Sequence, residues 1–391
     1  MTDISQRYNK RLDRMAVSLI RQFDEKVSNI PDILKLTLGE PDFNTPEDVK
    51  QAGIKAIADN YSHYTGMTGL PELRKAAADF VHKKYHLSYD YESEVLVTVG
   101  VTEGIAVSLL SVLEAGDKVI LPSPIFPGYE PIITLAGAEA VYIDTSDNGF
   151  VLSPEALEAS LQEHGAAVKA VVLNYPGNPS GVTYNRDEVK AIADVLKKYP
   201  VFVISDEVYS ELTYAGQHVS IAEFLPEQVI LLNGLSKSHA MTGWRLGLMF
   251  APEEITKELM KTHQYLVTSA ATQVQKAAVI ALTEGIDDAL PMKKEYLKRR
   301  DFVCEELAEL DFEVAKPSGA FYIFAKIPAS LKQDSMEFCV DLAEKAAVAV
   351  IPGIAFGPGG EGYVRISYAA SMENLVEAMK RISKYAKENQ K

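Results

Sequence analysis

A lysine between two serines follows an apolar run in the segment LNGLSKSHAMTGWRLG, residues 232–247. The run VILLN leads into it, so Lys237 stands where a buried strand is expected to end, and Arg245 follows it closely. Most single lysines are solvated surface groups. A lysine beside hydroxyl and guanidinium groups is also suited to capture an aldehyde as a Schiff base while its neighbours hold a phosphate. The rest of the chain has to distinguish these two interpretations.

The composition is that of a globular protein with a large core. The chain has 391 residues, 47% hydrophobic and 24% charged, and this length predicts a large domain with a smaller one. The net charge of −15 argues against nucleic-acid and anionic-membrane partners. The sequence has two cysteines, a polar start and no apolar run long enough to span a bilayer. We therefore expect a cytoplasmic location.

Short apolar runs alternate with amphipathic, helix-length segments in the middle of the chain. Val, Ile and Leu occupy both faces of these runs, as in strands covered by helices on two sides. The runs are VLVTV (95–99), KVILP (118–122), AVVLNYP (170–176), VFVISD (201–206), VILLN (229–233) and RLGLMF (245–250). The alternation predicts an α/β domain with a mostly parallel sheet, which we assign to residues 46–283.

The pattern changes after about residue 283. The order is then a charged helix (MKKEYLKRRDFVCEELAEL), the strands FEVAK and AFYIFAKI, the helix SMEFCVDLAEKAAV, the strand YVRISYA and a terminal helix. This predicts a smaller α+β domain over residues 284–391, completed by an N-terminal arm, residues 1–45. GPGGEG (357–362) has the spacing of a dinucleotide fingerprint, but a strand follows it instead of a helix. We interpret it as a loop.

Polar and aromatic groups stand at the carboxyl ends of the expected strands, where ligands bind in open α/β sheets. The first of these strands leads into a helix start, whose amides suit a phosphate. Each group alone has an ordinary interpretation, such as a turn glycine, a core aromatic or a satisfied buried carboxylate. Their accumulation at one edge predicts a cofactor site formed by Gly100, Val101, Thr102, Phe126, Asn178, Asp206, Tyr209, Ser236 and Lys237.

Pyridoxal 5′-phosphate (PLP) needs this combination of groups. Its aldehyde requires an amine, Lys237, which can later move the proton of the substrate Cα. Its ring nitrogen stays protonated beside a carboxylate such as Asp206. Its phenolate oxygen suits donors of the type of Tyr209 and Asn178. The phosphate and the ring face are left to Gly100, Val101, Thr102, Ser236, Arg245 and Phe126.

Several motifs resemble those of the class I and II aminotransferases of the PLP-dependent fold-type I family. They span residues 36–369 and include LTLGEPDF, YTGMTGLPELR, Asn178-Pro179, Asp206-x-x-Tyr209, SKSHAMTGWRLG and YVRISYA. One departure is Ser180, where the family usually has threonine. The resemblance implies a large, mostly parallel seven-stranded sheet domain with a smaller α+β domain. It also implies PLP as cofactor and a homodimer with both active sites at the interface.

The resemblance also implies roles for single residues and a reaction. Lys237 carries the cofactor, Arg365 clamps the substrate α-carboxylate together with Asn178, Gly39 lets the substrate approach the backbone, and Tyr64 reaches the phosphate of the neighbouring subunit. Two half-reactions move the amino group of an amino acid to 2-oxoglutarate. Segments such as IRQFDEKVSNIPDILKLTLGEPDF are most similar to aromatic amino acid aminotransferases of lactic acid bacteria. We therefore expect an aromatic donor.

Other functions remain open at this point. The same segments are similar to bacterial enzymes acting on N-acetyl-diaminopimelate, and aspartate is another possible donor. A C–S β-lyase of the same fold would use the same lysine and aspartate. A non-catalytic regulator would need an added DNA-binding domain, for which the chain leaves little room. The histidines show no metal-ligand spacing, so we expect no metal.

Overall fold

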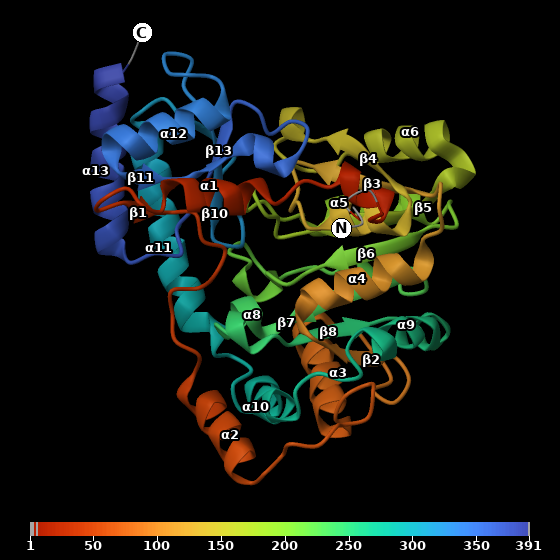
Figure 1. Cartoon of the computed structure of the whole chain (residues 1–391). Helices are drawn as coiled ribbons and strands as arrows, with labels where there is room; N and C mark the ends of the chain where they lie inside the picture. The colour runs from red at the N-terminus through yellow and green to blue at the C-terminus, as the bar shows by residue number, and fades with distance from the viewer. Residues whose placement is uncertain (1–3, 5–6, 390–391) are drawn as a thin grey trace.

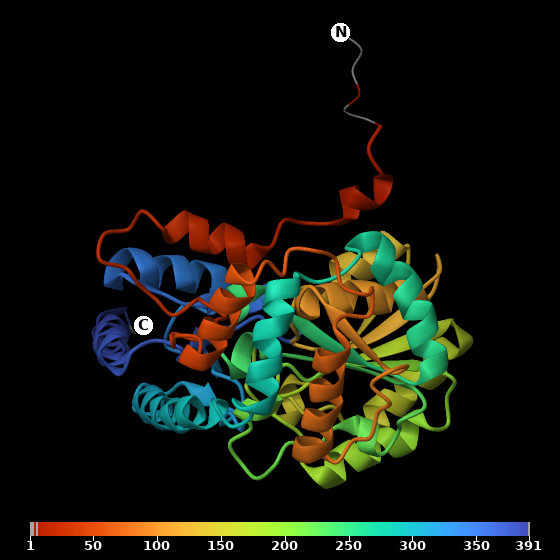
Figure 2. The ribbon, with the colours of Figure 1, turned by 90° about the horizontal axis from the view of Figure 1, so that it is seen from below.

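The structure is a computed structural model that describes residue 4 and residues 7–389. Residues 1–3 and 5–6 of the expected N-terminal arm, and residues 390–391, lie outside this description. The chain forms two parts that lie side by side, each with its own sheet (Figures 1 and 2).

The larger part contains a seven-stranded sheet with the order β2-β8-β7-β6-β5-β3-β4 (Figure 1). Neighbouring strands are parallel except for β8, which runs antiparallel to β2 and β7. The predicted mostly parallel, seven-stranded sheet is confirmed. Its strands are β2 (Val95–Thr98), β3 (Lys118–Ser123), β4 (Glu139–Asp144), β5 (Val168–Asn174), β6 (Phe202–Asp206), β7 (Val229–Gly234) and β8 (Gly247–Phe250).

The apolar runs of the sequence indicate six of these strands and miss β4. This strand lies at the edge of the sheet beside β3, and its end residues Glu139 and Asp144 are exposed. An edge strand with a partly solvated face has no continuous apolar run. The last run is also shorter than expected: Arg245 adopts a left-handed conformation with φ 55°, so β8 begins only at Gly247.

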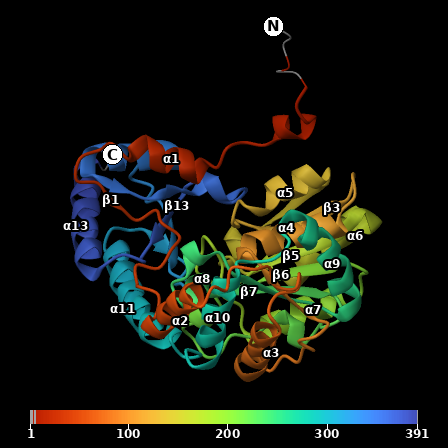
Figure 3. The same cartoon turned by 60° about the horizontal axis from the view of Figure 1, so that its bottom comes forward.

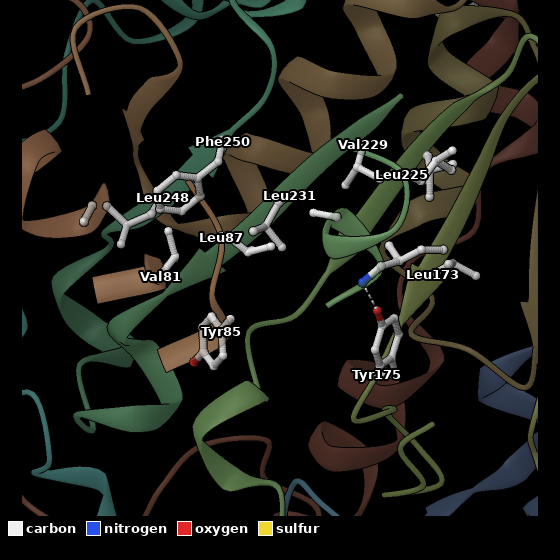
Figure 4. Packing of buried hydrophobic residues seen from close by; sticks show 14 of the residues in the cluster. Val81, Tyr85, Leu87, Leu173, Tyr175, Leu225, Val229, Leu231, Leu248 and Phe250 are labelled. Carbon is white, nitrogen blue, oxygen red and sulfur yellow. Dashed lines mark hydrogen bonds between the residues drawn. The ribbon is translucent and has the colours of Figure 1, made fainter. Parts of the chain in front are cut away.

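Helices cover both faces of the large sheet (Figure 3). The neighbours Leu231 and Leu232 of β7 enter different hydrophobic clusters, one on each face, which explains why apolar residues fill both faces of the runs. Figure 4 shows part of the first cluster around Leu231 and Phe250. The helices of this part are α2 (Glu47–Ala58), α3 (Pro71–Tyr85), α4 (Gly100–Val112), α5 (Tyr129–Ala136), α6 (Pro154–His164), α7 (Arg186–Leu196), α8 (Leu235–Ser238), α9 (Glu253–Leu266) and α10 (Thr272–Thr283).

The smaller part contains a four-stranded sheet with the order β12-β13-β10-β9. The strand pair and the helices expected after residue 283 are present, and residues 357–362 form a loop as predicted. The elements are β9 (Glu313–Val314), β10 (Tyr322–Lys326), β12 (Ile351–Pro352), β13 (Tyr363–Ser367), α11 (Ala289–Ala308), α12 (Ser335–Ala346) and α13 (Met372–Asn389).

N-terminal residues pack into the smaller part. β1 (Leu34–Lys35) pairs in parallel with β11 (Val348–Ala349), and Phe23 of α1 (Leu19–Val27) belongs to the same hydrophobic cluster as Leu375 of α13. The domain boundaries at residues 45 and 283 stay a prediction, because the hydrophobic clusters locate cores and not boundaries.

No helix among the described residues is long and apolar enough to cross a membrane. Within the same residues, no group of three or more His, Cys, Asp or Glu side chains is arranged to hold a metal ion.

Candidate active site

The predicted polar residues meet where the carboxyl ends of the large sheet face the small sheet. Asp206 ends β6, and Lys237 lies in the one-turn helix α8 directly after β7. Asn178 lies in the loop that follows β5. Arg365 comes from β13 of the other sheet, and its Nη1 donates to Asn178 Oδ1 over 2.9 Å. The candidate site therefore lies between the two sheets.

Lys237 is a partly buried amine with one hydrogen bond. Its Nζ donates a hydrogen bond to the carbonyl oxygen of Gly39 and lies 5.7 Å from the centroid of the Tyr209 ring. Burial lowers the pKa of Lys237 from 10.5 to about 8, although the carboxylates of Glu40 and Asp206 oppose that shift. A larger fraction of this amine than of an ordinary lysine is uncharged near neutral pH, as a nucleophile requires.

Asp206 is a buried carboxylate held by neutral groups. Burial raises its pKa from 3.8 to about 6, while hydrogen bonds from Tyr129 and from the amide of Val208 favour the charged form. Tyr129 Oη donates to Oδ2 over 2.7 Å. Asn174 donates to the Asp206 carbonyl over 3.1 Å and accepts the Asn178 amide over 3.0 Å. Such a carboxylate suits a protonated ring nitrogen.

Arg365 is a buried guanidinium at the junction of three segments. Besides its bond to Asn178, it donates from Nη2 to the carbonyl of Thr37 over 2.7 Å, and its Nε has no hydrogen-bond partner. Its Cζ lies 4.6 Å from the centroid of the Tyr322 ring. Burial lowers its pKa. A guanidinium with an unsatisfied buried donor suits the carboxylate of a substrate.

Two tyrosines and a glycine form the inner wall of the site. The hydroxyl oxygens of Tyr209 and Tyr322 lie 2.8 Å apart. A Cβ on Gly39 would lie 2.7 Å from Tyr322 Oη, so a larger residue there would displace this hydroxyl. The segment that carries Gly39 is held by Asp42, whose carboxylate oxygens accept from Arg299 over 2.8 and 2.9 Å.

Residues that we expect to bind the phosphate come together at the start of α4. Gly100 has φ 74°, and a Cβ there would lie 2.5 Å from Arg245 Nη2, so the guanidinium lies directly against this turn. On Gly247, a Cβ would lie 2.7 Å from the amide nitrogen of Val101. A helix N-terminus beside a guanidinium is suited to a phosphate. Thr102 of the same helix turn is exposed, and Ser236 of α8 is buried.

Two predicted residues lie at the margin of this cluster or outside it. The ring of Phe126 contacts Tyr129 edge-on, with 5.7 Å between the centroids, and lies in the loop after β3. Tyr64 is 86% exposed and does not join the cluster of its own chain. This placement is compatible with its expected role in a neighbouring subunit.

Sequence reasoning missed three residues that position the site. Tyr129, three residues after Phe126, has the pattern of a core aromatic in an amphipathic helix. Asn174 is the last residue of a buried strand, and this polar end was the one signal available for it. Tyr322 lies within an apolar strand, where nothing distinguishes a bridging tyrosine from a packed one.

Comparison with known proteins identifies the family. The family described as Aminotransferase class I and II matches residues 31–382. A probable N-acetyl-LL-diaminopimelate aminotransferase of Bacillus subtilis is 48% identical and covers 96% of this chain and 94% of its own. An aspartate aminotransferase of Thermus thermophilus, solved with maleate, aligns with a TM-score of 0.91 at 35% identity, over 96% and 99% of the chains. The chain therefore belongs to the class I and II aminotransferases. Its fold is the PLP-dependent fold type I.

The comparisons favour a different donor from the expected aromatic one. An aromatic-amino-acid aminotransferase of Thermococcus litoralis is 37% identical, over 97% of this chain and 98% of its own, less than the Bacillus protein. The alternative of an N-acetyl-diaminopimelate or aspartate donor is better supported. The motifs used for the resemblance hold the cofactor and the α-carboxylate, so they carry little information about the donor side chain.

Because the pKa of Asp206 is raised, we predict that Asp206→Asn changes the stability of the cofactor-free protein by an amount that depends on pH. The folded state binds a proton that the unfolded state releases between pH 3.8 and about 6, so this residue makes the protein less stable as the pH rises through that range. A shift of two units corresponds to about 3 kcal/mol. At pH 8 the variant should be more stable than the wild type by up to this amount, and near pH 4 the difference should vanish. Urea unfolding at both pH values measures it; a pH-independent difference would contradict the buried-charge interpretation.

Proposed function

We propose that this chain is a PLP-dependent aminotransferase that passes the amino group of an amino acid to a 2-oxo acid. The observation that carries the proposal is the convergence of Lys237, Asp206 and Arg365 in one buried site between two sheets. An amine with a lowered pKa, a carboxylate with a raised pKa and a guanidinium with a free donor match the aldehyde, the ring nitrogen and the substrate carboxylate.

The residues at the site fit PLP from one end to the other. Gly100 and Arg245 would hold the phosphate, and Phe126 the ring face. Asp206 would keep the proton on the ring nitrogen, and Tyr209 would donate to the phenolate oxygen. When bound, PLP supplies an aldehyde for covalent capture of an amine and a ring that withdraws electrons from the substrate Cα.

The residues of the chain then divide the work of proton transfer. Arg365 and Asn178 bind the substrate α-carboxylate and orient the Cα–H bond. Lys237 Nζ would take the proton from the substrate Cα and later return it. Because the same residues serve the donor and the acceptor in turn, ping-pong kinetics follow.

Lys237→Ala tests the site. The purified wild type should be yellow, and borohydride should fix the cofactor to a peptide containing Lys237. The variant should keep some cofactor and lose about a thousandfold or more of its turnover, because no second group offers both functions. Rates are measured with a saturating amino donor and 2-oxoglutarate. A near-normal rate in the variant would overturn the assignment.

For the substrates, we propose N-acetyl-LL-diaminopimelate as amino donor and 2-oxoglutarate as acceptor. The 48% identity to the probable N-acetyl-LL-diaminopimelate aminotransferase over nearly the full length of both chains supports this choice. Aspartate is the second candidate, supported by the similarity to the Thermus enzyme. Both donors carry a polar distal group, which an apolar pocket built for a ring would have to desolvate without a partner.

A donor comparison tests this proposal. With the concentration of 2-oxoglutarate held constant, kcat/KM should be at least about tenfold higher for N-acetyl-LL-diaminopimelate than for tyrosine. The value for aspartate should lie between the two. Tyrosine as the best donor would restore the aromatic alternative. Ammonia and pyruvate released from cystathionine without any 2-oxo acid would instead indicate a lyase.

We also propose that the protein forms a homodimer, as homologues of this fold usually do. Large apolar side chains are exposed on adjacent surfaces. α2 packs on α10, and the loop that follows α2 is held by Thr272, which donates to the His63 carbonyl over 2.6 Å. Large apolar side chains grouped on one exposed surface are typical of an interface. Its exposed members are Ile54, Ile57, Tyr61, Tyr64, Met67, Tyr265 and Leu266.

Ile57→Glu tests the dimer. Ile57 is 67% exposed, so the substitution should not harm the single chain, whereas a carboxylate buried without a partner weakens an interface. Sedimentation should show a dimer for the wild type and a shift of the variant towards the monomer, with at least about a tenfold higher dissociation constant. Val376→Glu, on an exposed face of the smaller part, serves as the control. A monomeric wild type would contradict the proposal.

A further inference from the structure

His263 is a buried histidine whose two ring nitrogens both face acceptors. It lies in the last turn of α9, and its side chain is fully buried. Nδ1 lies 2.7 Å from Glu103 Oε1, and Nε2 lies 2.8 Å from the carbonyl oxygen of Met67. The other oxygen of Glu103 accepts the amide of Val99 over 2.7 Å. Because a carboxylate and a carbonyl are both acceptors, this geometry fits an imidazole that donates from both ring nitrogens, which is the cationic form.

The surroundings stabilise this cation. Burial by itself lowers the pKa of His263, but the hydrogen bond and charge of Glu103, together with the Met67 carbonyl, outweigh it and leave the pKa above its ordinary value. The position at the C-terminal end of α9 is also favourable for a positive charge. His263 and Glu103 therefore form a buried, charge-assisted ion pair, which is stronger and more directional than a neutral hydrogen bond.

Glu103 connects this ion pair to the phosphate cradle, which is the turn of residues 99–101 that we expect to bind the phosphate. Its carboxylate lies in the first turn of α4 and reaches back to the amide of Val99, the residue before Gly100. Gly100 and Val101 begin the helix whose amides we propose to bind the phosphate. A shift of Glu103 would therefore shift the turn that must point its amides at the ligand.

The Met67 carbonyl connects the same ion pair to a second segment. Met67 lies in the loop that carries Tyr64, which is 86% exposed and is expected to reach the phosphate in a neighbouring subunit. The same loop is also held by Gln275, which accepts the Leu70 amide over 2.7 Å and donates to Thr65 Oγ1 over 3.2 Å. His263 holds the middle of this loop.

We propose that the His263–Glu103 ion pair positions phosphate-binding groups for two active sites at once. Through Glu103 it fixes the cradle of its own subunit, and through Met67 it fixes the loop that delivers Tyr64 to the partner. The proposal rests on the proposed PLP site and homodimer. His263 does not touch the reacting atoms, so it is a positioning residue and not a catalytic one.

Comparing two ligands separates this role from general structural support. The cofactor-stripped dimer is titrated with PLP and with pyridoxal, which lacks the phosphate, and binding is followed by visible absorbance. His263→Gln keeps a donor but removes the charge, and Glu103→Gln removes the opposite charge. Each should raise the dissociation constant of PLP about 10- to 100-fold, the range expected for losing a charge-assisted hydrogen bond. The constant for pyridoxal should change less than about twofold.

Thr262→Val provides the matched control. Thr262 precedes His263 on α9 and accepts a hydrogen bond from Ser111 of α4 over 2.7 Å, so the variant weakens the same helix pair away from the cradle. It should leave the ratio of the two dissociation constants unchanged. The proposal is overturned if the glutamine variants weaken PLP and pyridoxal equally, or weaken neither. A wild type that binds no PLP would contradict the proposed function instead.

Mixed dimers test the effect across the interface. Lys237→Ala in one subunit leaves a single site that borohydride can label, and His263→Gln is placed either in the subunit with Lys237 or in the other one. Both arrangements should need more PLP for half-maximal labelling than the mixed dimer carrying Lys237→Ala alone. Adding Tyr64→Phe to the subunit without Lys237 should abolish the effect of His263→Gln in that subunit. If His263→Gln acts only within its own subunit, the part of the proposal that concerns the partner is wrong.

Discussion

The burial of Arg365 between the two sheets is the constraint on which the site depends. Its guanidinium is 2% exposed and bonds at once to Asn178 of the large part and to the Thr37 carbonyl of the N-terminal segment. Loss of either acceptor would leave a further buried guanidinium donor unpaired, at a large cost. The two hydrogen bonds therefore tie the loop after β5 and the segment before Gly39 to β13, beside Lys237.

Burial shifts the pKa values of Lys237 and Asp206 in opposite directions for the same reason. Removal from water disfavours the charged form of any group, so the pKa of Lys237 falls to about 8 and that of Asp206 rises to about 6. In the protein alone, burial therefore disfavours the charged forms of both side chains. A ligand with a positively charged ring nitrogen would pair with Asp206, and its aldehyde would react with the amine of Lys237. The site is thus better satisfied with its cofactor than without it.

One geometric rule let the sequence predict which residues of the candidate site lie together. Asn178, Asp206 and Lys237 stand at or just after the ends of three neighbouring parallel strands, and parallel strands end at one edge. Tyr129, Tyr322 and His263 could not be found in this way. Each acts through a partner more than 70 positions away in the chain. The sequence around each is that of an ordinary packed helix or strand. The edge strand β4 was missed because a solvated face interrupts its apolar run.

The side chains of the site differ in how many hydrogen bonds hold them, and this difference matches their proposed roles. Asp206 is fixed by Tyr129 and by the Val208 amide, and the first turn of α4 is fixed by Glu103 and His263. In the proposed function these groups serve the two ends of a ligand that stays in place. Lys237 would instead bind the cofactor, release it and carry a proton. Within the described residues its Nζ makes a single hydrogen bond, to the Gly39 carbonyl. A rigid frame around an amine with one hydrogen bond suits the proposed reaction of two half-cycles on a fixed cofactor.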